Sequence, residues 1–159
     1  MNPTVSENAA VALRPATEAD LTAIHALLTA SDLPVVGVAE SLGGFTVAEH
    51  DGRIVGVVGI ESCGDRFALL RSTAVAPDYR KHGIGRRLVE RAVARAEAKG
   101  LSALYLLTTT AEAYFPSFGF RRVARETVPD EVKATEEFCS ACPSTATVMT
   151  LPLQHAPAA

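Results

Sequence analysis

A basic loop with two glycines leads into a long helical pattern in the middle of the chain. The loop, residues 80–85, has the sequence RKHGIG and follows a strand-like run that ends at Pro77. The first N–H groups of a helix lack partners within the helix, and with the helix dipole and nearby basic side chains they bind anions. The loop is therefore a candidate phosphate site. The alternative is a tight turn whose glycines only permit close packing.

Two common phosphate-binding loops do not fit these residues. The dinucleotide-binding pattern G-x-G-x-x-G requires a glycine at the position that Leu88 occupies. A P-loop requires Gly-Lys followed by Ser or Thr, and the sequence contains no such tripeptide. An anion site of another kind is the remaining interpretation.

Arg71 is a second candidate, because it is a charged residue inside the apolar run of residues 67–76. An unpaired charge is costly to bury, so the guanidinium meets either a carboxylate of the protein or a pocket. In a pocket it would bind an acidic group of a substrate through two nitrogen atoms. We favour the pocket role over the structural ion pair.

The chain contains three cysteines, Cys63, Cys139 and Cys142. An odd number without a secretory signal pattern predicts reduced thiols in the cytoplasm. Cys139 and Cys142 have C-x-x-C spacing, but a closed zinc site needs four ligands and no second pair exists. We therefore expect no metal site and small packed residues here. A soft, thiophilic ion held by all three thiols is the alternative.

The elements around these residues alternate between helical and strand-like patterns. Residues 84–99 carry apolar side chains at helical spacing and end at Gly100, while two β-rich runs flank Asp51 and Gly52, a pair typical of a tight hairpin. The other expected elements are strands at 11–16, 66–77, 101–108, 120–127 and 145–153 and helices at 16–30, 111–120 and 130–138. This order predicts a mixed α/β or α+β sheet.

Length and composition favour one domain. With 159 residues, 48% of them apolar, we expect a single domain at residues 10–153 with mobile termini at 1–9 and 154–159. The net charge of -3 argues against a protein that coats nucleic acid. No apolar run approaches the roughly 18–20 residues of a membrane span. We expect a cytoplasmic protein without nucleic-acid or membrane partners.

The run VAPDYRKHGIG, residues 75–85, resembles the R/Q-x-x-G-x-G/A loop of the GNAT (Gcn5-related) N-acetyltransferases, which lies between a strand ending in V-x-P and a long helix. The run LYLLTTTAEAYFPSFGF, residues 104–120, resembles the next strand of that family and the short helix before its Gly-Phe pair. This resemblance covers residues 10–125. It implies a mostly antiparallel sheet of about seven strands flanked by helices, with the fourth and fifth strands splayed.

The resemblance also implies an acetyl-CoA-dependent N-acetyltransferase whose loop holds the pyrophosphate of the co-substrate. Lys81, Arg86 and Arg87 would meet other phosphates, or they are solvated helix residues. The cofactor-binding residues implied are Thr73, Ala74, Val75, Arg80, Lys81, His82, Gly83, Ile84, Gly85, Arg86 and Thr110. The residues expected to bind the substrate are Arg71 and Ser72.

Acetyl transfer needs a neutral amine, a donor for the tetrahedral oxyanion and a proton for the leaving thiolate. A backbone N–H near Thr73 is expected to donate a hydrogen bond to the oxyanion. Phe115 occupies the position of the family's tyrosine acid, so neighbouring Tyr114 is the candidate acid; a tyrosine packed on the sheet is the alternative. Glu61 is the candidate base, with a solvated surface glutamate or a water relay as the alternatives.

The C-terminal run VKATEEFCSACPSTATVM, residues 132–149, resembles the ArsN-type acetyltransferases encoded in bacterial arsenic-resistance operons. That resemblance implies a small, amino-acid-like amine with an acidic tail, which suits Arg71. Two other functions stay open: a peptide or protein N-acetyltransferase, and a non-catalytic module that binds acyl-CoA or a thiophilic ion such as arsenite. GNAT proteins often form dimers, so a homodimer is an expectation of the same resemblance.

Overall fold

The computed structural model describes residues 11–135, 138 and 145–153. These residues fall into two compact units along the chain. The first comprises the described parts of Met1–Gly59 and Ser72–Ala92, and the second those of Ile60–Arg71 and Val93–Ala159.

The strands follow the order β1-β2-β3-β4-β5-β7-β6 in a seven-stranded sheet. The described neighbours pair antiparallel except for β4 and β5, which are parallel. The strands are β1 (Ala12–Pro15), β2 (Phe45–His50), β3 (Arg53–Cys63), β4 (Phe67–Val75), β5 (Ala103–Thr108), β6 (Arg121–Arg122) and β7 (Thr147–Pro152). The expected mixed, mostly antiparallel sheet is confirmed.

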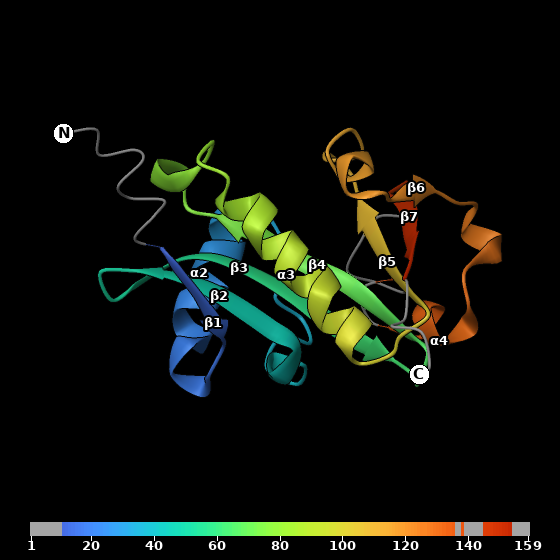
Figure 1. Cartoon of the computed structure of the whole chain (residues 1–159), viewed down its shortest axis with the longest axis horizontal. Helices are drawn as coiled ribbons and strands as arrows, with labels where there is room; N and C mark the ends of the chain where they lie inside the picture. Colours follow the sequence, from blue (N-terminus) through green and yellow to red (C-terminus); the bar gives the residue numbers. More distant parts are fainter. Residues whose placement is uncertain (1–10, 136–137, 139–144, 154–159) are drawn as a thin grey trace. The chain divides into compact units, whose positions relative to one another are not determined.

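Among the described residues, three α-helices and five 3₁₀ turns connect the strands (Figure 1). The helices are α2 (Leu21–Ala30), α3 (Ile84–Ala98) and α4 (Asp130–Lys133); the 3₁₀ turns are η1 (Glu18–Asp20), η2 (Leu42–Gly44), η3 (Pro77–Tyr79), η4 (Phe115–Phe118) and η5 (Arg125–Thr127). Within the part of the chain that is described, no helix combines the length and apolar character needed to cross a bilayer.

The β2–β3 hairpin forms where the sequence predicts it. Asp51 has φ 50° and Gly52 has φ 76°, so both lie in the left-handed region that a two-residue hairpin turn requires. Strand β1 pairs with the far edge of β2, with Ala12 opposite Glu49. The first unit therefore contains a three-stranded antiparallel arrangement of β1, β2 and the first part of β3.

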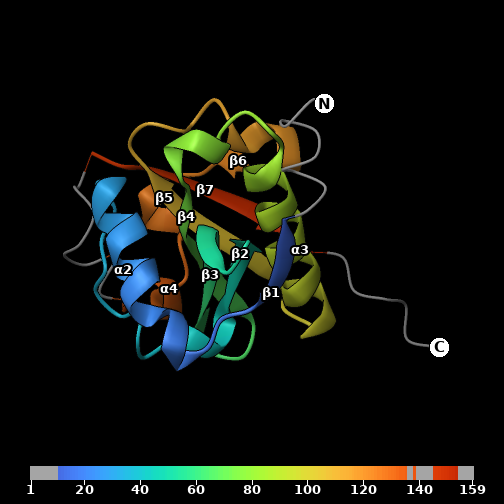
Figure 2. The ribbon, with the colours of Figure 1, turned by 90° about the vertical axis from the view of Figure 1, so that its left-hand side faces the viewer.

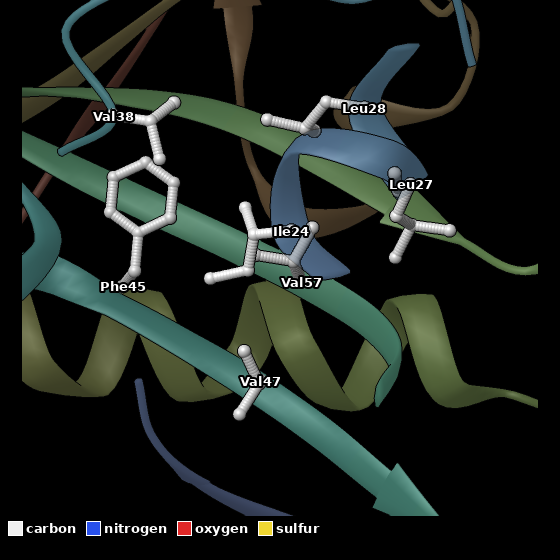
Figure 3. Close-up of a cluster of buried hydrophobic side chains, with 8 residues drawn as sticks. Ile24, Leu27, Leu28, Val38, Phe45, Val47 and Val57 are labelled. Atoms are coloured by element: carbon white, nitrogen blue, oxygen red, sulfur yellow. The ribbon is translucent and has the colours of Figure 1, made fainter. Parts of the chain in front are cut away.

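Helix α2 and the first half of α3 cover opposite faces of these strands (Figure 2). The α2 face holds a fully buried cluster that includes Ile24, Leu28, Phe45 and Val57 (Figure 3). On the α3 face, a Cβ built on Gly56 would lie 2.9 Å from Leu88 Cδ1. Side chains of successive strand residues point to opposite faces, so each strand contributes to both layers.

The residue immediately before helix α2, Asp20, is acidic and is held in place by an arginine. The carboxylate of Asp20 accepts from the backbone N–H of Thr17 at 2.8 Å. Arg14 donates to both oxygens of Asp20, at 2.8 and 2.9 Å, and its Nε donates to Glu49 at 2.8 Å. These bonds lower the pKa of Asp20 to about 2, and they join β1, β2 and the start of α2.

In the second unit, β7 runs antiparallel beside β5 over the full length of both strands (Figure 1). The expected strand at 120–127 is shorter than predicted: β6 contains two residues, because the Thr127 N–H bonds back to the Ala124 carbonyl and closes a turn. Of the helix expected at 130–138, α4 covers residues 130–133 and residues 134–135 form a turn, while residues 136–137 lie outside the described part of the chain. Val132 on α4 packs with Cys63 and Leu69 in the core of this unit.

Candidate functional site

The predicted anion loop follows η3 in the first unit and has an unusual backbone. Lys81 has φ 68° and Gly83 has φ 80°. The left-handed region costs a residue with a side chain roughly 1–2 kcal/mol, so the conformation at Lys81 must be held by its surroundings. One stabilising contact comes from the preceding residue, Arg80, whose Nε donates a hydrogen bond to the Val75 carbonyl at 2.9 Å. The loop is thus tied to the end of β4.

Helix α3 begins at Ile84 with no acidic residue in its first turn, which leaves the positive end of the helix dipole uncompensated by the helix itself. Arg86 lies 3.7 Å from Glu90 in an exposed ion pair. The Nη2 of Arg87 donates to the Val11 carbonyl at 3.0 Å, so this side chain ties α3 to the start of β1. Of the two arginines, Arg86 is the more exposed.

The end of β4 carries the residues expected to line the co-substrate. Ser72 is buried and has φ 61°, so the strand has an irregular position there. Ala74 packs into the cluster beneath α2, and Val75 accepts the bond from Arg80. The Ala76 N–H donates to the Val55 carbonyl at 2.8 Å, which holds this end of β4 beside β3. The cofactor role of Thr73, like those of its neighbours, stays a prediction.

The second unit brings two other predicted residues together. Arg71 Nη1 lies 2.8 Å from Glu61 Oε1, with the Arg71 side chain 1% exposed and that of Glu61 19% exposed. The structure therefore supplies a protein carboxylate for Arg71, which is the structural alternative rather than the pocket role that the sequence favoured. Substrate binding by Arg71 and base catalysis by Glu61 stay predictions, and either role must operate from this ion pair.

Cys63 lies next to that pair along β3. Its Sγ donates to the Glu61 carbonyl at 3.3 Å. Burial, with the nearby charges of Glu61 and Glu131, raises the pKa of the Cys63 thiol to about 12. The described residues contain no cluster of three or more metal-ligating side chains, while Cys139 and Cys142 lie outside the described residues.

The candidate acid Tyr114 lies in the loop between β5 and η4 and is 39% exposed. Its ring meets those of Phe115 and Phe118 edge-on, at 5.3 and 5.2 Å between centroids. Phe115 is buried and packs edge-on against Phe120 at 5.8 Å. The phenylalanine at the family's tyrosine position therefore belongs to the core of the second unit, whereas Tyr114 stays accessible.

Residues that the sequence did not single out fix this loop. Thr108 Oγ1 accepts from the Ala111 N–H at 2.9 Å. Glu112 accepts from Arg122 and, at 2.8 Å, from Thr147 Oγ1, and these bonds lower its pKa. A threonine at the end of a strand is a signal for such a turn, but the Glu112 contacts join residues far apart in sequence. Thr110, a predicted cofactor residue, is exposed in the same loop.

Comparisons with known proteins agree with this fold. The family model for the acetyltransferase (GNAT) domain matches residues 41–122, just over half of the chain. An uncharacterized N-acetyltransferase of Chlorobaculum tepidum is 31% identical over 109 residues, which cover 69% of this chain and 68% of that protein. The amino-acid acetyltransferase of Azotobacter vinelandii is 39% identical over 89 residues, but these cover 55% of this chain and 21% of that protein.

Solved structures share the fold. N-acetylglutamate synthase of Neisseria gonorrhoeae, complexed with coenzyme A and N-acetyl-glutamate, aligns with a TM-score of 0.78 at 21% identity, over 91% of this chain and 35% of that one. The ribosomal-protein-S18-alanine N-acetyltransferase of Escherichia coli aligns with a TM-score of 0.67 at 21% identity, over 92% and 96% of the two chains. The family model and the Chlorobaculum relative together show that the chain belongs to the family of acetyltransferase (GNAT) domains and is an acyltransferase.

Proposed function

We propose that this protein transfers the acetyl group of acetyl-CoA to the amine of a small, amino-acid-like molecule. The binding of acetyl-CoA, the donor in this reaction, is supported mainly by the conformation of the loop before α3. Its left-handed residues Lys81 and Gly83 turn the chain into a helix whose first turn has no acidic side chain. Successive N–H groups in such a turn form a concave anion site.

The donor fits this loop through its pyrophosphate. The N–H groups of residues 81–85 bind the phosphate oxygens, and the helix dipole adds a favourable interaction with the negative charge. Arg86 is exposed beside them, and we infer that it exchanges its exposed ion pair with Glu90 for a further phosphate. Arg87 contributes by holding α3 to Val11 rather than by binding phosphate.

The acyl transfer itself requires little covalent help. The neutral amine attacks the thioester carbonyl, the Thr73 N–H stabilises the oxyanion, and the thiolate leaves with or without a proton from Tyr114. A thiol with an ordinary pKa near 8.5 leaves acceptably, so a missing acid slows the reaction rather than abolishing it. Glu61 Oε1 is engaged by Arg71, so a water molecule is the simpler route for the amine proton.

The acceptor class is supported by relatives and by sequence resemblance. Several relatives are amino-acid acetyltransferases, although this chain spans about a fifth of their length. One structural neighbour contains N-acetyl-glutamate. The ArsN-type resemblance of residues 132–149 extends the class to arsenic- and phosphorus-containing amino acids, with a link to arsenic detoxification. An acidic tail on the acceptor would compete with Glu61 for Arg71.

Release of CoA tests the proposal. The protein and acetyl-CoA are mixed with each of a panel of amines, comprising proteinogenic amino acids, arsenic- and phosphorus-containing amino acids, polyamines and peptides, and free thiol is measured. We expect release above background with one or more amino-acid-like amines, and an acetylated product by mass spectrometry. Binding of acetyl-CoA without thiol release from any member of the panel would contradict a catalytic role.

A peptide N-acetyltransferase is the second candidate. It is favoured by the alignment with the S18-alanine enzyme, which covers nearly the whole of both chains. In the same panel this function predicts release with peptides and none with free amino acids. The thiophilic-ion module is less well supported, because the raised pKa of Cys63 leaves little thiolate to bind a soft ion. This function would be supported if arsenite raised the melting temperature of the protein and the Cys63→Ser substitution abolished that increase.

A further inference from the structure

Tyr79 is buried and directly precedes the donor loop, and its hydroxyl meets the half-buried side chain of His50. Neither residue has a part in the proposed chemistry. His50 Nδ1 lies 2.7 Å from Tyr79 Oη, and the two rings meet edge-on at 5.5 Å. We propose that this pair is a latch that holds the donor loop in its acetyl-CoA-binding conformation. The inference rests on the proposed function of the loop, and it makes both residues positioning residues rather than catalytic ones.

The two residues belong to segments of very different rigidity. His50 ends β2 and pairs with Arg53 across the hairpin turn, so its backbone is fixed by the sheet. Tyr79 ends the short turn η3, where its N–H donates to the Ala76 carbonyl at 2.9 Å. Arg80, the first residue of the loop, follows directly. The side-chain hydrogen bond therefore connects a fixed strand to the residue from which the loop departs.

Both partners are well shielded, which makes this hydrogen bond more informative than one at the surface. Tyr79 is 8% exposed and the His50 side chain is 14% exposed. A shielded polar group that loses its partner is not fully compensated by water, so the bond specifies a single arrangement of the two segments. Asp51, whose side chain is 85% exposed, lies 3.7 Å from the other ring nitrogen of His50.

The loop needs stabilising contacts because its backbone conformation is intrinsically unfavourable at one position. Lys81 occupies the left-handed region, which a free lysine rarely adopts. With the latch broken, the loop would populate other conformations, and the apparent affinity for acetyl-CoA would fall by the fraction that remains competent. Once acetyl-CoA is bound, the reacting groups are unchanged. Loss of the latch should therefore raise KM for acetyl-CoA and leave kcat nearly constant.

Tyr79→Phe and His50→Ala each remove one half of the hydrogen bond. We expect each to raise the Kd and KM for acetyl-CoA roughly threefold to tenfold, the range for one neutral hydrogen bond, with kcat changed by less than about twofold. The double variant should be no weaker than the weaker single variant, because both remove the same bond. His50→Asn, whose amide reaches the position of Nδ1, should recover most of the affinity.

Thr150→Val is the matched control. It removes another buried neutral hydrogen bond, from Thr150 Oγ1 to the Leu104 carbonyl at 2.9 Å, in the second unit. We expect it to lower the melting temperature without altering the Kd for acetyl-CoA measured by titration calorimetry. The latch is refuted if Tyr79→Phe binds acetyl-CoA as the wild type does, if Thr150→Val weakens binding equally, or if kcat falls while KM does not change. Wild-type protein that binds no acetyl-CoA would overturn the proposed donor loop as well.

Discussion

Removing the carboxylate of Glu61 distinguishes a structural Arg71 from one that serves the substrate. Arg71 is 1% exposed and lies 2.8 Å from Glu61. A buried charge that loses its partner destabilises a protein by about 3–5 kcal/mol, whereas removing both charges together is often close to neutral. Because Glu61 is 19% exposed, water relieves part of this cost, and we expect Glu61→Ala to lower the free energy of unfolding by about 3 kcal/mol.

Urea unfolding followed by circular dichroism measures the effect. Glu61→Gln keeps an oxygen that accepts from Arg71, so we expect it to lose only about 1–2 kcal/mol. The double variant Arg71→Met with Glu61→Leu should be more stable than Glu61→Ala. Glu90→Ala is the control, because it removes an exposed carboxylate 3.7 Å from Arg86, a pair worth about 0.3–0.5 kcal/mol.

Two results would refute the structural role. Glu61→Ala with stability within 1 kcal/mol of the wild type, about the size of a typical point-mutant effect, would mean that the ion pair contributes little in solution. A folded Arg71→Met with Glu61→Leu variant whose KM for the acceptor amine rises tenfold or more, about 1.4 kcal/mol, would assign Arg71 to the substrate. An unchanged KM for the amine would mean that Arg71 stabilises the fold and does not bind the substrate.

Three further predictions concern packing and ionisation. A Cβ on Gly59 would lie 2.4 Å from Cζ of the fully buried Phe45, so Gly59→Ala should destabilise by about 1–3 kcal/mol in urea unfolding; Gly43→Ala, whose Cβ meets nothing within 4 Å, should not, and equal stability of the two variants would contradict the packing. The raised pKa of Cys63 should make its alkylation at pH 8, followed by peptide mass spectrometry, far slower than in urea, and equal rates would contradict its burial. The pKa of Asp20 is lowered to about 2, so its contribution to stability is complete above about pH 4 and is lost as the pH falls toward 2. Asp20→Asn should flatten that pH dependence; an identical slope would show that another carboxyl causes it.

The elements that the sequence predicted well are those specified by local chemistry. The turn at Asp51 and Gly52 follows from two residues that tolerate positive φ, and α3 follows from apolar side chains at helical spacing. The turn before α3 belongs to this class too, because its glycine spacing and the following helix are neighbours in sequence, while its role in binding the donor stays a prediction. Short elements were predicted less well: α4 and β6 depend on packing and turns in the second unit, which local propensity does not encode.

The contacts between distant residues could be predicted only in part. A sequence with one strand-like run that ends at residue 62 and another at 66–77 permits Glu61 to meet Arg71, and a carboxylate partner is one of the two alternatives for this arginine. The register of the two strands decides between them, and a shift by one residue would reverse which face each side chain occupies. The bond between His50 and Tyr79 spans 29 positions and has no local signal at all.

This difference explains why the donor is easier to infer than the acceptor. A pyrophosphate is bound largely by backbone N–H groups, so a short segment with the right turn residues and a following helix is sufficient to predict it. An acceptor is selected by side chains whose charge state and partners depend on the whole fold, and Arg71 shows how one contact changes the interpretation. Neutralising Arg71 together with Glu61 is therefore more informative about the acceptor than any substitution in the loop, because it changes the one buried charge that the fold and the substrate would share.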